Sequence, residues 1–452
     1  MLNAVASWAQ LAPTRTALEE PTGTLSYGAL WAASNSLADV LRAEQCRVVA
    51  LDIPNGTHWV IAHLACLIAQ LPQLPLPPFF SAAQRTHAMR DAGADACLRL
   101  ENGALQLSRY TAAPVVLPFG TALITYTSGS TGQPKGVCLS AEGMAQVAQS
   151  LLDVLGEATA ARHLSVLPLG VLLEQVGGLY PALMAGGRYI MRAEPLHEAL
   201  AASEATSCIL VPELLKALLP HAQPYPALRF AAVGGARVNP QLLDTAAQLG
   251  LPVFEGYGLS EAASVVAVNR PGHAKPSTVG NILPHHSYRI APDGELLLQQ
   301  VAMLGYAGSS ALPSREFATG DLVSVDSEGY LSIHGRKKNL LITGMGRNIS
   351  PEWPESLLTA HPAITQACVH GDADAGLHAL IVSTAPDALI ERAIAHTNAL
   401  LPADAPIRDW QRVAPFTVAD GLLTGNGRLR RHAILTRYTK DMNDGFLRPA
   451  CA

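Results

Sequence analysis

The chain has 452 residues, of which 49% are hydrophobic and 15% are charged. This balance excludes an intrinsically disordered chain and predicts a well-packed enzyme of two or more domains. The net charge of −5 argues against a nucleic-acid-binding protein, which usually presents a basic surface. The seven cysteines form no Cys-x-x-Cys pair, so we expect buried free thiols in a reducing cytoplasm and no zinc site.

No signal peptide or membrane span is expected. The N-terminus lacks a charged segment followed by an apolar core. The longest uncharged stretch, residues 59–80, is interrupted by four prolines, and this predicts a buried helix followed by a loop. His285 and His286 follow a proline in a loop-like context, and we expect them at the surface.

The first hundred residues alternate between helical and strand patterns. Ser26 is a candidate N-cap for the helix predicted after it, because apolar residues then recur at helical spacing. Such alternation is typical of a doubly wound parallel sheet. The predicted elements are a helix over 27–41, a strand over 47–52, helices over 58–69 and 81–93, and a strand over 96–98.

The strongest functional signal is a loop rich in glycine and hydroxyl side chains at residues 126–136, Tyr-Thr-Ser-Gly-Ser-Thr-Gly-Gln-Pro-Lys-Gly. Apolar runs at 122–124 and 137–139 flank it and predict strand, loop, strand. Glycines let backbone N–H groups turn toward an anion, hydroxyls donate to phosphate oxygens, and Lys135 adds positive charge. Turn chemistry alone explains so dense a run poorly.

This loop is not a Walker phosphate loop. Counted from Gly129, that pattern requires Gly at 134 and Ser or Thr at 136, where this chain has Pro134 and Gly136. Proline has no N–H to offer a phosphate, and glycine has no hydroxyl for a metal. A kinase-type phosphate-loop enzyme is therefore disfavoured.

The loop instead resembles the phosphate-binding signature of the adenylate-forming superfamily, which includes AMP-binding acyl-CoA synthetases, peptide-synthetase adenylation domains and firefly luciferase. Four further blocks resemble the family's motifs in the same order, so the resemblance covers essentially the whole chain. They are Gly234-Gly235-Ala236, Tyr257-Gly258-Leu259-Ser260-Glu261, Thr319-Gly320-Asp321 and Gly335-Arg336.

The expected fold is α/β. It comprises a large N-terminal AMP-binding domain (1–336) with doubly wound sheets and a small β-barrel subdomain, and a smaller, mobile α+β C-terminal domain (337–452). Short alternating strands after residue 279 favour the barrel. The resemblance places a hinge near Lys338, about which the smaller domain rotates between half-reactions.

The resemblance also implies roles for individual residues. Lys135, Glu261, Arg336 and Arg428 take the catalytic positions, and Glu261 holds Mg²⁺. ATP is bound by the following residues: Thr127, Ser128, Gly129, Ser130, Thr131, Gly132, Gly234, Gly235, Ala236, Tyr257, Gly258, Ser260, Asp321 and Arg336. Among them Tyr257 covers adenine, Ser260 meets the α-phosphate and Asp321 accepts from the ribose hydroxyls.

Two half-reactions are implied. A carboxylate attacks the α-phosphate of ATP, giving an acyl-adenylate and pyrophosphate. The thiol of CoA, or of 4′-phosphopantetheine on an acyl carrier protein, then displaces AMP and forms a thioester. Gly344, Gly346 and Pro351 lie in a block that resembles the one used in the thioester half.

Arg428 stands where the family has its adenylation lysine. Arginine keeps the charge but is longer and planar, so three interpretations stay open. Arg428 replaces the lysine, adenylation is slow, or the enzyme mainly performs the thioester half on a pre-formed adenylate. An alternative of another class is a non-catalytic protein that binds acyl-adenylate or nucleotide.

The residues of the acid-binding block favour an apolar acid. Leu169 stands where adenylation domains for amino acids place an aspartate, and a buried ammonium without a carboxylate partner is costly. Val171 stands where long-chain acyl-CoA synthetases usually have histidine. Gly177 and Gly178 would leave room for a chain beside a helix. We therefore predict an apolar carboxylic acid, a fatty acid in particular, as substrate.

Overall fold

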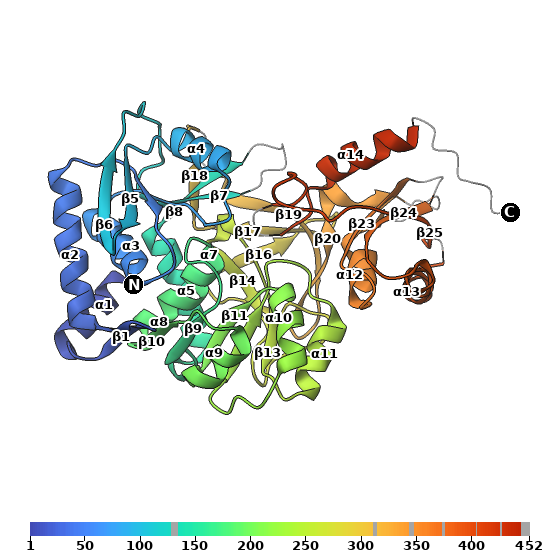
Figure 1. Cartoon of the computed structure of the whole chain (residues 1–452), viewed down its shortest axis with the longest axis horizontal. Helices are drawn as coiled ribbons and strands as arrows, with labels where there is room; N and C mark the ends of the chain where they lie inside the picture. The colour runs from blue at the N-terminus through green and yellow to red at the C-terminus, as the bar shows by residue number, and fades with distance from the viewer. Residues whose placement is uncertain are drawn as a thin grey trace. The chain divides into compact units, whose positions relative to one another are not determined.

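The computed structural model describes residues 1–127, 134–310, 314–342, 348–372, 376–403, 405–424 and 427–443. The chain forms two compact units. The first comprises Met1–Thr319 and Val323–Ile333, and the second comprises Gly320–Leu322 and His334–Ala452. The predicted α/β fold with a large N-terminal and a smaller C-terminal part is confirmed (Figure 1). The division after Ile333 lies close to the predicted one, and the hinge at Lys338 stays a prediction.

A nine-stranded sheet forms one half of the first unit, in the order β15-β14-β13-β12-β11-β9-β10-β1-β2. Its strands from β13 to β1 are parallel, and the flanking strands pair antiparallel. The strands are β1 (Thr16–Glu20), β2 (Gly23–Ser26), β9 (Arg162–Ser165), β10 (Arg188–Met191), β11 (Ser207–Leu210), β12 (Phe230–Val233), β13 (Val253–Leu259), β14 (Ser264–Val268) and β15 (Asn281–Ile282).

A seven-stranded sheet of order β18-β8-β7-β4-β3-β5-β6 forms the other half. Strands β7, β4, β3 and β5 are parallel, whereas β6, β8 and β18 pair antiparallel. The strands are β3 (Val49–Asp52), β4 (Gln73–Pro75), β5 (Ala96–Glu101), β6 (Ala104–Arg109), β7 (Thr121–Thr127), β8 (Lys135–Ser140) and β18 (Met303–Tyr306).

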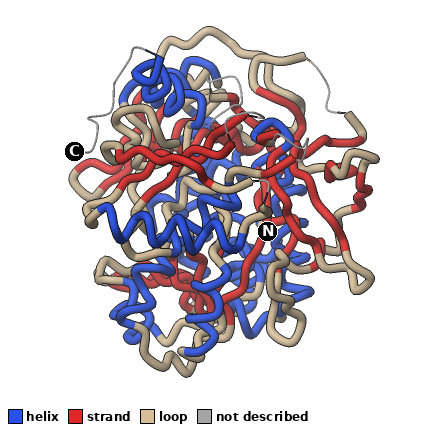
Figure 2. The backbone as a smooth tube through the Cα atoms, turned by 90° about the vertical axis from the view of Figure 1, so that its right-hand side faces the viewer, coloured by secondary structure: helices blue, strands red, loops and turns tan. Residues whose placement is uncertain are grey.

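Helices separate and cover these two sheets. Helix α5 contacts β7 and β8 of one sheet, and η1 contacts β9 and β11 of the other, so both lie between the sheets. Figures 1 and 2 show this helical layer with strands on either side. The helices are α1 (Leu2–Leu11), α2 (Tyr27–Ala43), α3 (Thr57–Ala69), α4 (Ala82–Asp91), α5 (Ala141–Leu155), α6 (Glu157–Ala160), α7 (Leu172–Glu174), the π-helix η1 (Gln175–Leu179), α8 (Tyr180–Met184), α9 (Leu196–Ser203), α10 (Pro212–Leu218), η2 (Leu219–His221), α11 (Pro240–Gln248) and η3 (Ser260–Ala262).

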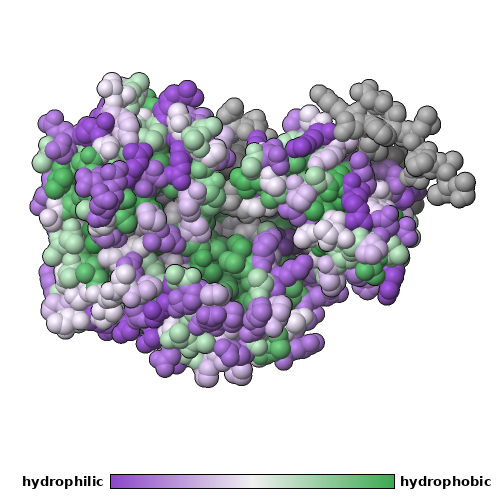
Figure 3. Space-filling model, viewed as in Figure 1, coloured by the Kyte–Doolittle hydropathy of each residue, from purple (hydrophilic) through white to green (hydrophobic). Residues whose placement is uncertain are grey.

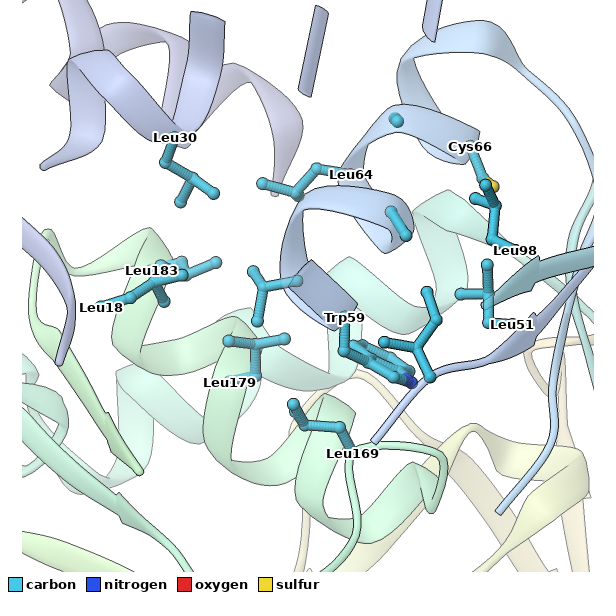
Figure 4. Packing of buried hydrophobic residues seen from close by; sticks show 14 of the residues in the cluster. Leu18, Leu30, Leu51, Trp59, Leu64, Cys66, Leu98, Leu169, Leu179 and Leu183 are labelled. Carbon is cyan, nitrogen blue, oxygen red and sulfur yellow. The ribbon is translucent and has the colours of Figure 1, made fainter. Parts of the chain in front are cut away.

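The helices predicted over 27–41, 58–69 and 81–93 are confirmed as α2, α3 and α4. Ser26 caps α2, since its side chain accepts a hydrogen bond from the Ala29 N–H. Figure 4 shows what the first helices bury: Trp59 and Leu64 of α3 pack among leucines from α2, β3 and the segment around Leu179. Each such fully buried side chain stabilises the fold by about 1.5–3 kcal/mol relative to its exposed state. This cluster fixes α2 and α3 on one side of the first unit.

The strands expected to form the barrel make a four-stranded sheet of order β16-β17-β19-β20. These are β16 (Ser287–Ile290), β17 (Glu295–Gln299), β19 (Glu316–Val325) and β20 (Leu331–Arg336). Strand β18, which lies between them in sequence, pairs with β8 instead. This pairing places Tyr306 opposite Val137, near the end of β8 that follows the predicted phosphate loop.

The second unit mixes short strands and helices, as the α+β prediction requires. Its three-stranded sheet has the order β23-β24-β25, and β21 pairs with β22. The elements are η4 (Lys337–Asn339), β21 (Leu341–Ile342), β22 (Asn348–Ile349), α12 (Glu352–Ala360), β23 (Gln366–Asp372), β24 (Gly376–Val382), α13 (Asp387–Leu400), β25 (Ile407–Arg412) and α14 (Arg431–Asn443).

One face of the protein is mixed in polarity (Figure 3). On the face shown in Figure 3, apolar residues are interspersed among hydrophilic ones. Within the described ranges, no helix is both long enough and apolar enough to cross a membrane. The expectation that His285 and His286 lie at the surface is wrong for His286, which is buried. His285 is half-buried, and its Nδ1 lies 2.8 Å from the Ser150 hydroxyl of α5.

Candidate active site

The glycine- and hydroxyl-rich loop joins two paired strands. Strands β7 and β8 are antiparallel, with Thr127 opposite Lys135, so the predicted strand–loop–strand arrangement is confirmed. Lys135 begins β8 and is exposed. Five predicted phosphate-binding residues lie outside the described residues: Ser128, Gly129, Ser130, Thr131 and Gly132.

Helix α4 holds both ends of this loop. The Tyr126 hydroxyl donates to Asp91 Oδ2 at 2.6 Å, and His87 Nε2 lies 3.3 Å from the Pro134 carbonyl oxygen. Burial raises the pKa of Tyr126, and Asp91 raises it further, so the hydroxyl keeps its proton. A Cβ at Gly136 would lie 3.0 Å from the Tyr126 ring, which explains a glycine at that position. The two described ends of the loop are therefore both held by α4.

Tyr306 lies between two predicted catalytic residues. The Lys135 ammonium lies over the Tyr306 ring, 5.5 Å from its centroid. The Tyr306 hydroxyl faces Glu261 Oε1 at 3.5 Å. Sequence analysis did not identify Tyr306, because its position depends on the pairing of β18 with β8, two segments far apart in the chain.

Glu261 fits a magnesium ion that a nucleotide helps to bind. Among the described side chains, no group of three or more His, Cys, Asp or Glu residues could hold a metal. Mg²⁺ typically takes one or two carboxylates and completes its shell with substrate phosphates and water. A single half-buried carboxylate on η3, close to Lys135 and Tyr306, has the chemistry of such a site.

The predicted adenine-binding segments are neighbours. Gly234, Gly235 and Ala236 follow the carboxyl end of β12, where ligands of open α/β sheets usually bind. A Cβ at Gly234 would lie 3.1 Å from the Gly256 carbonyl oxygen of β13, one residue before Tyr257. The two segments thus approach closely enough that a side chain at 234 would disturb them.

Tyr257 and Gly258 lie in strand β13. Strand β13 continues to Leu259 because it pairs with β14, with an irregularity between Tyr257 and Gly258. A Cβ at Gly258 would lie 1.6 Å from the Ser264 carbonyl oxygen, so only glycine fits there. Glu261 follows in the short helix η3, which begins at Ser260.

The four predicted pocket residues separate into two groups. Leu169 is fully buried in the core around Trp59, and its N–H donates to Asn55 Oδ1 at 2.8 Å. Val171 precedes α7 as its N-terminal flanking residue. Gly177 and Gly178, in contrast, line a narrow cavity of about 20 Å³.

This cavity lies between helices and the nine-stranded sheet. Its wall is mainly apolar, with Leu151 and Leu152 of α5 opposite Ile209 of β11. Its volume holds about one water molecule. A Cβ at Gly177 would lie 3.0 Å from Ile209 Cδ1, so the two glycines leave space that larger residues would fill.

A buried polar cluster supports the π-helix that carries these glycines. Glu174 is fully buried, and its Oε1 accepts from the Tyr189 hydroxyl at 2.7 Å and lies 3.1 Å from His163 Nε2. The Leu167 N–H donates to its other oxygen at 3.2 Å. His163 Nδ1 in turn lies 2.9 Å from the Ser207 hydroxyl. Glu174 is thereby tied to β9, to the segment that follows β9 and to β10, and it fixes the start of η1.

The second unit brings Asp321 and Arg336 together. Arg336 Nε lies 2.6 Å from Asp321 Oδ1, and the Asp321 side chain is only 4% exposed. A Cβ at Gly335 would lie 2.3 Å from the Cβ of Ser350, the residue before Pro351. Gly344 and Gly346 lie outside the described part of the chain.

Arg428 lies in a tight turn. Its carbonyl oxygen accepts from the Thr424 N–H at 2.8 Å, and its own N–H donates to the Thr424 hydroxyl at 3.0 Å. Arg431, three residues on, is largely buried and paired with Glu355, so it does not extend a basic surface from Arg428. Burial lowers the pKa of Lys338, the predicted hinge residue, and Arg336 lowers it further.

The chain is similar to known AMP-binding enzymes. A family model described as AMP-binding enzyme matches residues 5–115 and 99–302. The long-chain-fatty-acid–CoA ligase FadD15 of Mycobacterium bovis is 35% identical over 248 residues, which cover 47% of this chain and 41% of that protein. The 2-succinylbenzoate–CoA ligase of Salmonella typhimurium is 32% identical over 383 residues, which cover 80% of this chain and 82% of that protein.

Among solved structures, o-succinylbenzoate CoA synthetase of Bacillus subtilis, in complex with its acyl-adenylate intermediate, superposes with a TM-score of 0.83. It is 25% identical, and the match covers 96% of this chain and 97% of that one. The chain spans about half the length of the curated relatives it matches first. The ordered motifs, the fold and the family match agree, and the chain belongs to the AMP-binding enzyme family of the adenylate-forming superfamily.

Proposed function

We propose that the protein is an AMP-forming acid–thiol ligase. It activates an apolar carboxylic acid with ATP to an acyl-adenylate and then passes the acyl group to the thiol of CoA or of a carrier-protein pantetheine. The observation that carries this proposal is the grouping of Lys135, Tyr306 and Glu261 beside the base of the phosphate loop. The relatives reported above, which bear the names of acyl-CoA ligases, support it.

The proposed roles follow from charge and position. The Lys135 ammonium is exposed at the start of β8 and offers a positive charge to the phosphates. Gly234 and Gly256 leave a flat backbone surface beside Tyr257 for the adenine ring. Mg²⁺, bound with the nucleotide, neutralises charge on the departing pyrophosphate. Asp321, Arg336 and Arg428 keep the ribose and phosphate roles that the motifs predict for them.

We further propose a fatty acid as the substrate. The cavity beside Gly177 and Gly178 has three leucines, Ile209 and Phe230 in its wall, and at about 20 Å³ it would have to widen to admit an acyl chain. Leu169, at the position where amino-acid-activating relatives place a carboxylate, is buried among apolar residues. The named relatives act on a long-chain fatty acid in one case and on an aryl acid in the other, so the experiment must include both classes.

A second candidate rests on Arg428. If arginine supports adenylation poorly, the enzyme is a ligase that mainly converts a pre-formed acyl-adenylate into a thioester. The tight turn held by Thr424 is compatible with both candidates, because it fixes the backbone and leaves the identity of the side chain as the difference. A non-catalytic nucleotide-binding protein is the remaining alternative.

The test is ATP–pyrophosphate exchange over a panel of saturated fatty acids, aryl acids and amino acids. Exchange with fatty acids, followed by thioester formation with CoA or a pantetheinylated carrier protein, is the expected result. Exchange with amino acids only would exclude the proposed acid class. Thioester formation from synthetic acyl-adenylate without exchange would identify the second candidate, and nucleotide binding without either reaction would identify the third.

A further inference from the structure

Tyr306 joins two charges of opposite sign that belong to separate motifs. Lys135 begins β8, and Glu261 lies in η3 more than a hundred residues later. Both contact the same tyrosine, the lysine through the ring face and the glutamate through the hydroxyl. The pairing of β18 with β8 sets Tyr306 opposite Val137, two residues from Lys135, so the tyrosine position is fixed by backbone hydrogen bonds.

We propose that Tyr306 is a positioning residue for the adenylation half-reaction, holding Glu261 for the metal and Lys135 for the pyrophosphate of ATP. This inference rests on the proposed function. The two parts of the side chain act separately. The hydroxyl orients the Glu261 carboxylate, and the ring face holds the ammonium by a cation–π contact.

The chemistry of the tyrosine suits this role. A tyrosine hydroxyl ordinarily keeps its proton at neutral pH, so it can donate to the Glu261 carboxylate that it faces. A donor distance of 3.5 Å is long, and contacts of this kind tighten when the substrate complex forms. A neutral ring attracts Lys135 without neutralising it, so the ammonium keeps its full charge for the phosphates.

Two substitutions separate the effect of the Tyr306 hydroxyl from that of its ring. Tyr306→Phe removes only the hydroxyl, and Tyr306→Leu removes the ring as well. Tyr288→Phe is the matched control, because Tyr288 is an exposed tyrosine of the same unit, on β16. Each variant and the wild type are compared by calorimetric titration with ATP, in the presence and absence of Mg²⁺, and by melting temperature.

The expected outcome differs between the two variants. Tyr306→Phe weakens ATP binding about tenfold with Mg²⁺ and leaves it unchanged without Mg²⁺, because a hydrogen bond to a charged group is lost. Tyr306→Leu weakens binding about a further threefold, with or without Mg²⁺, because the cation–π contact is also lost. Thioester formation from synthetic acyl-adenylate, which involves no pyrophosphate, stays at the wild-type rate in both.

Two results would overturn the inference. One is a Tyr306→Phe protein that matches Tyr288→Phe in its Mg²⁺-dependent ATP binding. The other is an equal loss in both half-reactions together with a lower melting temperature, which would make Tyr306 a purely structural residue. Absence of exchange by the wild type would instead count against the proposed function. If Tyr306→Leu does not fold, the Mg²⁺-dependent ATP binding of Tyr306→Phe alone tests the inference.

Discussion

His63 of α3 is held in a fully buried network. Its Nδ1 lies 2.7 Å from Gln73 Oε1, its Nε2 lies 3.0 Å from the Tyr180 hydroxyl, and the Trp59 ring stacks on it. Burial lowers the pKa of His63 from 6.5 to about 4, and the hydrogen bond to Gln73 opposes this only partly. The folded protein therefore keeps this ring neutral where an unfolded chain would protonate it.

The pH dependence of stability follows from this lowered pKa. His63 binds a proton below pH 6.5 in the unfolded chain but only near pH 4 in the folded protein. The contribution of the neutral His63 to the free energy of unfolding is therefore complete above pH 6.5 and is lost as the pH falls toward 4. Between pH 7 and pH 5 the loss is about 2 kcal/mol. In urea unfolding of His63→Gln, the free energy of unfolding should depend correspondingly less on pH over this range. His273→Gln, at an exposed position, should keep the wild-type slope, and a His63→Gln profile of wild-type slope would contradict the assignment.

At the scale of the element, η1 shows why two adjacent glycines are not equivalent. A Cβ at Gly178 would lie 2.3 Å from His163 Nε2, and that ring is held between Glu174 and Ser207. A Cβ at Gly177 would lie 3.0 Å from the terminal Cδ1 of Ile209, and its next neighbours, at 3.9 Å, are at ordinary contact distance. The histidine ring cannot move without breaking buried hydrogen bonds, whereas the isoleucine end can rotate.

Alanine substitutions at Gly177 and Gly178 should therefore change the free energy of unfolding by different amounts. Gly178→Ala should lower the free energy of unfolding by about 1–3 kcal/mol, the usual cost of overpacking. Gly177→Ala should stay within about 1 kcal/mol of the wild type, since the helical preference of alanine offsets the shift of Ile209. Chemical denaturation measures both. Equal destabilisation by the two variants would show that the His163 ring is not the obstacle.

Helix α14 begins at a buried ion pair. Arg431 donates to Glu355 Oε1 at 2.6 Å and to the Val369 carbonyl oxygen at 3.2 Å, and its side chain is 17% exposed. It also lies 3.4 Å from Glu352. These contacts join the start of α14 to α12 and β23. Because Arg431 comes just after the turn that contains Arg428, the contacts of Arg431 also fix one end of that turn.

Removing one partner of the Arg431–Glu355 ion pair should lower the free energy of unfolding more than removing both. Arg431→Leu leaves a buried carboxylate uncompensated and should destabilise the second unit by about 3–5 kcal/mol. The double variant Arg431→Leu/Glu355→Leu should recover part of this loss. Hydrogen exchange in α12 and β23 reports on this unit. Arg437→Leu on the same helix, where the side chain is 51% exposed, is the control and should change little.

At the scale of the whole molecule, the sequence was most informative where one motif or one periodicity decides the structure. The helices α2 and α3 and the β7–β8 hairpin follow from local patterns, and the family follows from the order of five motifs. Tyr306 was missed because its role depends on the pairing of β18 with β8. His286 was placed wrongly because its burial depends on tertiary packing, which no local signal in the sequence reveals.

The barrel prediction shows the same limit. Turn residues and alternation predicted short strands after residue 279 correctly, but they do not specify partners. Strand β18 joins the seven-stranded sheet, while its sequence neighbours β17 and β19 pair with each other. Partner choice depends on which edge is available once the rest of the chain has folded, and that information is not local.

The proposed reaction uses residues of both units, and Arg428 is the one that departs from the family pattern. Its guanidinium can bridge carboxylate and phosphate oxygens as a planar fork, which a lysine cannot do. We expect exchange by the wild type, a decrease of about tenfold in Arg428→Lys, and of about 10²–10³-fold in Arg428→Ala, the range seen when a donor to developing charge is lost. Thioester formation from synthetic acyl-adenylate should stay unchanged.

The comparison of half-reactions decides between the candidates. Arg437→Lys alters an exposed arginine of the same unit and should leave both rates at the wild-type level. If Arg428→Lys raised exchange tenfold or more while thioester formation stayed constant, the arginine would be a defect for adenylation. The chain would then act mainly on a pre-formed adenylate. A decrease in Arg428→Lys means instead that the surrounding site is built for the longer, forked side chain.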